Sequence, residues 1–258
     1  MPVDGVVPFP PELAARYRRL GYWRDETLDQ VFSELFDRHR DRVALLGSDH
    51  SITYGELGQR SASMAGALYE RGLRPLDRVV LHLPNGPEFV QLYFALQKLG
   101  VIPILALAPH RRLEIDHFVW LAEAVAYFGS DSELAAEVQA ANPSLRHTMM
   151  LEELGELPER EAPQLKIDPS DPCVLLLSGG TTGIPKLIPR SHNDYLYNSR
   201  AAAAVQDIEP DSCQLSVLPL AHNMPLACPG VQGFLMQGAR IVIGTSVKAP
   251  DVFEQIER

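Results

Sequence analysis

Apolar residues recur at intervals of three and four along much of the chain, with polar residues between them. This spacing places Leu28, Phe32 and Leu35 on one side of a helix. Thr27, directly before them, is a candidate N-cap. Such a stripe is typical of a helix that packs against a core. Further helices are predicted over residues 56–71, 88–99, 114–124, 133–141, 194–206, 231–236 and 251–258.

Short apolar runs lie between the predicted helices and indicate buried strands. Strands that alternate with helices form βαβ units, whose parallel sheets are covered by helices on both faces. We therefore expect an α/β fold with largely parallel sheets. The predicted strands comprise two within residues 43–54 and one within each of 78–83, 101–107, 126–128, 147–151, 173–177, 187–188, 214–218 and 240–243.

The composition changes in residues 153–172, where four prolines and many acidic residues occur without periodicity. Stretches of this kind are typical of connectors between lobes. The sequence thus predicts a first α/β lobe at 1–152, a connector at 153–172 and a second α/β lobe at 173–258. The second lobe is expected to be incomplete, because the chain stops in a new helical segment.

The charge balance argues against general nucleic-acid binding. The formal net charge is −10, from 23 Lys and Arg against 33 Asp and Glu, whereas such binders normally carry a basic excess. Hydrophobic residues make up 46% of the chain, enough for a substantial core. A local basic pocket remains compatible with this overall balance.

The three cysteines, Cys173, Cys213 and Cys228, are widely spaced, and no CxxC pair occurs. Neither a zinc site nor a disulfide framework is indicated, so reduced thiols in the cytoplasm are the simplest interpretation. The N-terminus lacks the pattern of a signal peptide, and the most apolar run, 101–108, is too short to span a bilayer. A cytoplasmic protein without a membrane partner is therefore predicted.

The stretch LLLSGGTTGIPKLIPRSH, residues 175–192, joins a buried strand to a loop of small and hydroxyl residues. Glycines let successive backbone N–H groups converge on an anion, and serine and threonine hydroxyls add donors. Lys186 adds a positive charge, worth roughly 4 kcal/mol against a phosphate at about 4 Å before desolvation is subtracted. The predicted phosphate-binding set is Ser178, Gly179, Gly180, Thr181, Thr182, Gly183 and Lys186.

This loop is not a Walker loop. That pattern places Gly-Lys-Ser/Thr directly before a helix, whereas Ile184 and Pro185 come between the last glycine and Lys186 here. The alternative is a surface hairpin with turn glycines. The complete run after a buried strand favours phosphate binding.

Segment 175–192 resembles the phosphate-loop signature of the acyl-adenylate-forming enzymes, which include acyl-CoA synthetases, luciferases and nonribosomal peptide adenylation domains. SITYGEL at 51–57 and LPNGPEFVQLYFALQKLGVIPI at 83–104 resemble further parts of that family. KLIPRSHNDY at 186–195 and PLAHNMPLACPG at 219–230 resemble the stand-alone aryl-acid AMP ligases that start siderophore assembly. The resemblance covers nearly the whole chain. It implies the N-terminal part of the adenylate-forming fold, with two largely parallel sheets flanked by helices.

The resemblance also implies a reaction in two steps. ATP and an aryl carboxylic acid, salicylate or 2,3-dihydroxybenzoate, give an aryl-adenylate and pyrophosphate. The aryl group then passes to the phosphopantetheine thiol of an aryl carrier protein. The phosphate-binding set would close over the β- and γ-phosphates, and Mg²⁺ would share the work by bridging phosphate oxygens.

The acid pocket is assigned by the same resemblance. Asn223 matches the residue that contacts the ortho-hydroxyl of the acid, and His222 matches a catalytic-site ring near the carboxylate. Met224 and Cys228 would line the aromatic ring, with Met224 in place of the usual Tyr or Phe. Cys228 replaces the Ser of many dihydroxybenzoate enzymes, and a thiol is a weak partner for a 3-hydroxyl. Salicylate is therefore favoured.

Each of these residues has a structural alternative. His222 could simply belong to a proline turn, and Met224 and Cys228 could be core residues. Arg190 and His192 lie close to the phosphate loop, but a solvated strand end explains both, so we predict no role for them.

Several family segments have no counterpart in these residues. They are the second ATP segment, the aspartate that holds the ribose, the hinge, and the C-terminal domain with the lysine that meets the α-phosphate. The 258-residue chain alone is therefore expected to be inactive. Two alternatives stay open: a non-catalytic remnant that keeps an acid pocket, and an enzyme that makes an aryl-CoA thioester.

Overall fold

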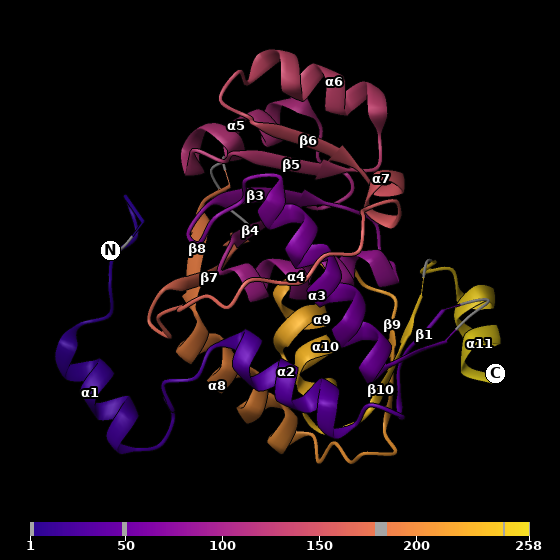
Figure 1. Ribbon diagram of the computed structural model, residues 1–258. Helices are drawn as coiled ribbons and strands as arrows, with labels where there is room; N and C mark the ends of the chain where they lie inside the picture. The colour runs from indigo at the N-terminus through magenta and orange to yellow at the C-terminus, as the bar shows by residue number, and fades with distance from the viewer. Residues whose placement is uncertain (1–2, 48–50, 179–184, 245, 258) are drawn as a thin grey trace.

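The computed structural model describes residues 3–47, 51–178, 185–244 and 246–257. They form two sheets with helices between and around them (Figure 1). The larger sheet has six strands in the order β6-β5-β3-β4-β7-β8. Its strands are β3 (Arg78–His82), β4 (Ile102–Leu105), β5 (Ala126–Gly129), β6 (His147–Met150), β7 (Pro172–Leu177) and β8 (Leu187–Ser191).

Neighbouring strands of the six-stranded sheet run parallel except for β7 and β8, which form an antiparallel hairpin. The smaller sheet has the order β2-β1-β10-β9, with one antiparallel pair, β1 and β2. The prediction of largely parallel sheets is confirmed. The strands of the smaller sheet are β1 (Val43–Leu46), β2 (Ser51–Thr53), β9 (Cys213–Ser216) and β10 (Arg240–Ile243).

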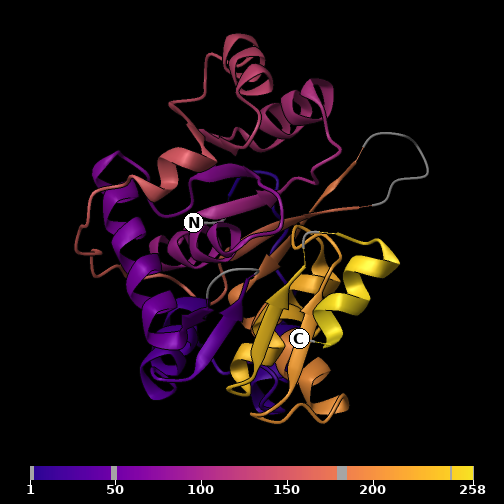
Figure 2. The same cartoon turned by 90° about the vertical axis from the view of Figure 1, so that its right-hand side faces the viewer.

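Sheet membership crosses the predicted lobe boundaries. β7 and β8 follow residues 153–172, yet β7 pairs with β4 of the larger sheet. β1 comes early in the chain, yet it pairs with β10. Figure 2 shows β7 and β8 extending beyond the other strands of their sheet. The division of the chain into 1–152, 153–172 and 173–258 therefore does not follow the sheets, and as a division into folding units it stays a prediction.

Helices fill the space between the sheets and cover the outer face of the larger one (Figure 1). A single apolar cluster joins α2, α3 and α4 to strands of both sheets, and a second joins α5 and α6 to β3, β4 and β5. The helices are α1 (Pro11–Arg19), α2 (Leu28–Arg38), α3 (Tyr54–Glu70), α4 (Pro87–Leu99), α5 (Arg112–Ala122), α6 (Ser132–Ala141), α7 (Leu151–Gly155), α8 (His192–Val205), α9 (Asn223–Ala227), α10 (Gly230–Met236) and α11 (Ala249–Glu257).

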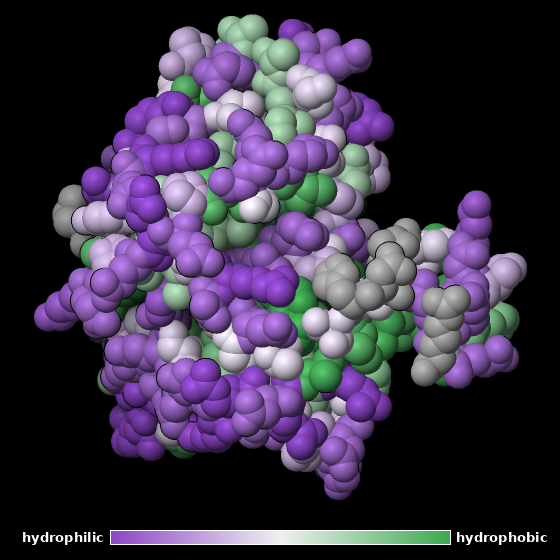
Figure 3. Space-filling model, turned by 45° about the vertical axis from the view of Figure 1, so that its right-hand side comes forward, coloured by the Kyte–Doolittle hydropathy of each residue, from purple (hydrophilic) through white to green (hydrophobic). Residues whose placement is uncertain are grey.

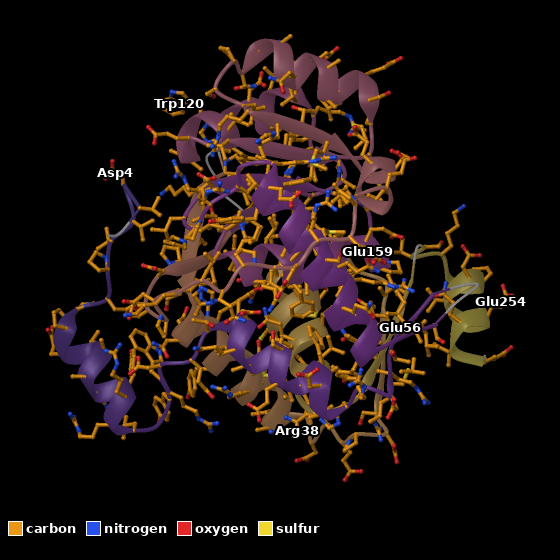
Figure 4. The ribbon with its side chains drawn as sticks, in the orientation of Figure 1. Asp4, Arg38, Glu56, Trp120, Glu159 and Glu254 are labelled. Carbon is orange, nitrogen blue, oxygen red and sulfur yellow. The ribbon has the colours of Figure 1, made fainter. Side chains whose placement is uncertain are left out.

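Local signals set several helix ends. Thr27 caps α2, as predicted, and Ser191 caps α8; each side chain accepts a backbone N–H bond. The Glu56 side chain, labelled in Figure 4, accepts from the backbone N–H of Thr53 and completes a capping box at α3. Gly100 ends α4 with φ 65°, a left-handed conformation that favours glycine.

Three short or exposed helices were not predicted as such. α1 has no buried residue and lies apart from the sheets (Figure 1). α7 begins just before the predicted connector, and α9 occupies a stretch that was expected to be a turn. In the part of the chain that is described, no helix is long and apolar enough to cross a membrane.

α11 also has no buried residue, although its sequence is amphipathic. Phe253 and Ile256 on this helix are 63% and 64% exposed, and Val247 before it is 69% exposed. Figure 3 shows apolar surface gathered between this helix and the body of the molecule.

Candidate functional site

The base of the phosphate hairpin is described, and its tip is not. Ser178 follows β7 and Lys186 precedes β8. The Ser178 N–H donates to the Lys186 carbonyl at 2.9 Å, and the Lys186 N–H donates to Ser178 Oγ at 3.0 Å. These bonds close the hairpin through backbone atoms of Lys186 and leave its side chain exposed. Gly179, Gly180, Thr181, Thr182 and Gly183 lie outside the described residues.

The hairpin is braced by a bond between its own two strands and by a contact from α5. Cys173 Sγ donates to the Arg190 carbonyl across the two strands at 3.2 Å, and burial raises the pKa of that thiol. The His117 ring on α5 bonds to the Pro185 carbonyl at 3.2 Å. Lys186 therefore projects from a fixed base.

The predicted acid-pocket residues lie in one loop, which we call the acid loop and define as residues 217–229 between β9 and α10. His222 is the residue before α9, Asn223 and Met224 start that helix, and Cys228 follows its last residue. His222 and Met224 are exposed, and Cys228 is half-buried. Met224 is thus not a core residue, since 47% of it is exposed.

Asn223 has the most distinctive environment in the acid loop. Its Oδ1 atom is buried and accepts no hydrogen bond from any described residue. A buried amide oxygen without a donor costs about 1–3 kcal/mol. The atom therefore has an unused acceptor position.

A residue for which the sequence predicted no role, Asn85, holds the acid loop in place. Asn85, between β3 and α4, donates through Nδ2 to the carbonyls of Leu218 at 2.9 Å and Gly244 at 3.3 Å. Its Oδ1 accepts from the Leu220 N–H at 2.8 Å. The side chain therefore ties the larger sheet to the acid loop and to the end of β10.

The structure assembles two groups of predicted residues. Ser178 meets Lys186 at the hairpin base, and His222, Asn223, Met224 and Cys228 share the acid loop. Within the described part of the chain, no hydrogen bond or ion pair joins one group directly to the other. Any ligand that used both groups would itself have to connect them.

His192 is not part of a solvated strand end, so that expectation is wrong. The ring is 1% exposed, and its Nδ1 accepts from the Leu28 N–H at 3.1 Å, which links α8 to α2. Burial lowers the pKa of His192 to about 4, so the ring is neutral at pH 7. Arg190 is also partly buried, in an ion pair with Asp194. Both residues have structural partners.

Among the described side chains, no group of three or more His, Cys, Asp or Glu residues could hold a metal ion. Mg²⁺ that is bound mainly through nucleotide phosphates needs only one or two protein ligands. The residues are therefore compatible with Mg²⁺ that arrives with ATP.

Residues 32–258 match the family model described as AMP-binding enzyme. The chain belongs to this family. The chain is 45% identical to triostin synthetase I of Streptomyces triostinicus, over 99% of its own length and 50% of that protein. It is 39% identical to the salicyl-AMP ligase / salicyl-S-ArCP synthetase of Mycobacterium tuberculosis and 38% identical to the 2,3-dihydroxybenzoate-AMP ligase of Bacillus subtilis, over 99% of the chain in both cases.

The fold agrees with this membership. The apo structure of Mycobacterium smegmatis MbtA superposes with a TM-score of 0.94 at 39% identity, over 98% of this chain and 50% of MbtA. The predicted fold, the N-terminal part of an adenylate-forming enzyme, is confirmed. The chain spans about half the length of the curated relatives that it matches.

Proposed function

We propose that the protein containing this chain activates an aryl carboxylic acid with ATP. The acid carboxylate attacks the α-phosphate, the bond to the β-phosphate breaks, and aryl-AMP and pyrophosphate result. The aryl group then passes to the phosphopantetheine thiol of an aryl carrier protein, and AMP leaves. The observation that carries the proposal is the identity of 39% and 38% to two named aryl-acid AMP ligases over 99% of the chain.

The phosphate hairpin would bind the leaving pyrophosphate. The Lys186 side chain is exposed beside the closed hairpin base, and its ammonium has no partner among the described residues, so it would be able to reach a β- or γ-phosphate. The hydroxyl proton of Ser178 remains available, because its oxygen accepts from Lys186 N–H. Gly179, Gly180, Thr181, Thr182 and Gly183 complete the proposed phosphate set. ATP is the proposed cosubstrate, and Mg²⁺ would supply charge neutralisation at its phosphates.

The acid loop would bind the aryl acid. Asn223 Oδ1, buried and unpartnered among the described residues, would accept a hydrogen bond from the ortho-hydroxyl. Met224 and Cys228 would contact the ring, and His222 would lie near the carboxylate at the mouth of the site. We favour salicylate over 2,3-dihydroxybenzoate, because the half-buried Cys228 thiol offers a 3-hydroxyl only a weak partner.

We extend the proposal to a biosynthetic pathway and to a cellular compartment. Relatives 38% and 36% identical carry the names pyochelin synthase PchD and vibriobactin-specific 2,3-dihydroxybenzoate-AMP ligase, and we propose siderophore biosynthesis on that basis. All three cysteines are free, which fits the reducing cytoplasm.

The test is acid-dependent ATP–pyrophosphate exchange by the full-length protein. Salicylate, 2,3-dihydroxybenzoate and benzoate are compared at equal concentrations, with an aliphatic acid as the control. We expect exchange with the hydroxylated aryl acids and the highest kcat/KM with salicylate. Exchange with none of the aryl acids would refute the proposal and favour a non-catalytic acid-binding remnant.

An aryl-CoA ligase is the second candidate. It is favoured by 38% identity to a Streptomyces protein named salicylyl-CoA synthase / salicylate adenylyltransferase, over 93% of this chain. The two functions share the adenylation step and differ in the thiol that accepts the aryl group. To distinguish the two functions, CoA and a phosphopantetheinylated carrier protein are offered in separate reactions. Mass spectrometry of the products then shows which thiol carries the aryl group.

A further inference from the structure

A network of buried polar side chains reaches the acid loop from the core. Gln232 on α10 donates through Nε2 to Tyr93 Oη on α4 at 2.7 Å. Ser199 Oγ on α8 lies 2.8 Å from Gln232 Oε1 and 3.0 Å from the Ala227 carbonyl. We call Tyr93, Gln232 and Ser199 the Ser199 network. It ends on the carbonyl directly before Cys228, one of the proposed acid-binding residues.

The Ser199 network lies wholly inside the molecule. Tyr93, Ser199 and Gln232 are each 0% exposed, and they come from three different helices. Tyr93 belongs to the main apolar cluster, and burial raises the pKa of its hydroxyl, which stays neutral. Buried polar groups are costly unless they are hydrogen-bonded, and a satisfied network restricts the geometry of the groups that it joins. The group that it restricts here is the end of α9.

The Ala227 carbonyl has two candidate donors. Ser199 carries one hydroxyl proton, and three acceptors lie within reach: Gln232 Oε1, the Ala227 carbonyl and the Tyr195 carbonyl, the last at 3.2 Å. Asn198 Nδ2 donates to the same Ala227 carbonyl at 2.6 Å. Asn198 and Ser199 are thus two separate holds on this carbonyl from α8, and only the Ser199 hold connects the carbonyl to Gln232 and Tyr93 in the core.

Other contacts constrain the acid loop at both ends. Asn85 bonds to Leu218 and Leu220 near the start of the loop. Directly after the loop, Gly230 has φ 48°, and a Cβ there would lie 2.2 Å from the Pro225 carbonyl oxygen. The loop thus has little freedom to absorb a shift at Ala227, and such a shift would pass to Cys228.

We propose that Ser199, supported by Gln232 and Tyr93, is a positioning residue that sets the placement of Cys228 and so controls acid recognition. The inference rests on the proposed function of the acid loop. It adds a determinant of acid selectivity that does not itself touch the acid. Loss of the network would move one wall of the acid site and leave the phosphate hairpin unchanged.

The test uses the full-length protein with Ser199→Ala, Tyr93→Phe and a matched control, Ser61→Ala. Ser61 is also a buried helical serine, 3% exposed, but its hydroxyl has no partner among the described residues. We expect Ser199→Ala to raise the KM for salicylate about three- to tenfold, as for the loss of one buried hydrogen bond, and to leave the KM for ATP unchanged. The ratio of kcat/KM between salicylate and 2,3-dihydroxybenzoate should change as well. Ser61→Ala should alter neither value.

Tyr93→Phe keeps the test decisive if Ser199→Ala does not fold, because it removes one oxygen far from the loop. It should raise the acid KM in the same direction by a smaller factor. The inference would be overturned if the folded variants showed an unchanged KM for the acid, or equal rises in the KM values for the acid and for ATP. In either case, exchange by the unaltered protein would still support the proposed function. An unaltered protein that is inactive with every aryl acid would overturn both.

Discussion

At the scale of single residues, burial separates structural from candidate binding side chains. His192 and Asn223 each have a buried polar atom without a partner among the described residues. The His192 ring is otherwise enclosed and bonded through Nδ1 to α2, which indicates a structural role. Asn223 is only half-buried and lies in a loop with exposed neighbours, which suits ligand binding.

Asn223→Ala should selectively weaken the recognition of ortho-hydroxylated acids. Loss of one hydrogen bond predicts a fall in kcat/KM for salicylate of about three- to tenfold, whereas benzoate has no hydroxyl to lose. Exchange assays of the full-length protein with both acids measure this difference. Equal losses for the two acids would remove the assigned role of Asn223.

His192 should make stability depend on pH. Its folded pKa of about 4 lies below the ordinary value of 6.5, so the unfolded state binds the proton first as the pH falls. The stabilisation is complete above about pH 6.5 and is lost towards pH 4, with roughly 2 kcal/mol lost between pH 7 and pH 5. His192→Asn keeps an acceptor for the Leu28 N–H but has no imidazole to protonate. Its free energy of unfolding should therefore fall by about 2 kcal/mol less between pH 7 and pH 5 than that of the unaltered protein. Denaturant unfolding at the two pH values compares the variants, and identical losses would contradict the prediction.

At the scale of elements, two loops are held by side chains and backbone groups of other segments. The phosphate hairpin is closed by bonds between Ser178 and Lys186, and the acid loop is tied by Asn85 to the turn before α4. Because the closing bonds of the hairpin use backbone atoms of Lys186, its ammonium can be removed without opening the base.

Lys186→Met should therefore raise the KM for ATP with little change in the KM for the acid. A hydrogen bond to a charged phosphate predicts an effect of about 10- to 100-fold. Lys166→Met is a matched control, since Lys166 is also exposed but lies in the segment before β7. An ATP KM that is unaltered in Lys186→Met would argue against phosphate binding by this residue.

Asn85→Ala should loosen the acid loop. It removes two donated bonds and one accepted bond at a partly buried site, and we expect the free energy of unfolding to fall by about 2 kcal/mol. Asn85→Asp keeps the acceptor for Leu220 but turns a carboxylate oxygen towards two carbonyls, so it should be no more stable than the alanine variant. Thermal melts rank the three proteins, and an Asp variant as stable as the unaltered protein would be evidence against this account.

At the scale of the whole molecule, strands from distant parts of the chain share each sheet. β1 pairs with β10, and β4 pairs with β7. The proposed ATP and acid residues follow β7 and β9, in different sheets. A complete site thus depends on how the sheets pack together.

Residues 1–258 expressed alone should not catalyse ATP–pyrophosphate exchange. They span about half of the relatives that they match, and the resemblance assigns the adenosine and α-phosphate contacts to the other half. The measurement is exchange with salicylate for this fragment beside the full-length protein. Steady acid-dependent exchange by the fragment would contradict the prediction.

Local chemistry in the sequence determined where most elements begin and end. The caps at Thr27 and Ser191 and the end of α4 at Gly100 depend on residues within one turn of the helix. The glycine loop and the PLAHNMPLACPG segment likewise identified the family from neighbouring residues. Short helices such as α9 were not predicted, because five residues are too few to establish a helical period.

Only the tertiary structure decided which distant groups meet. The sequence placed His192 at a solvated strand end, but α2 packs over it and buries it. Neither the three bonds of Asn85 nor the Ser199 network has a local pattern, since their partners lie far apart in the chain. Burial and long-range hydrogen bonding arise when surfaces of separate elements come together, and spacing along one segment contains no information about that encounter.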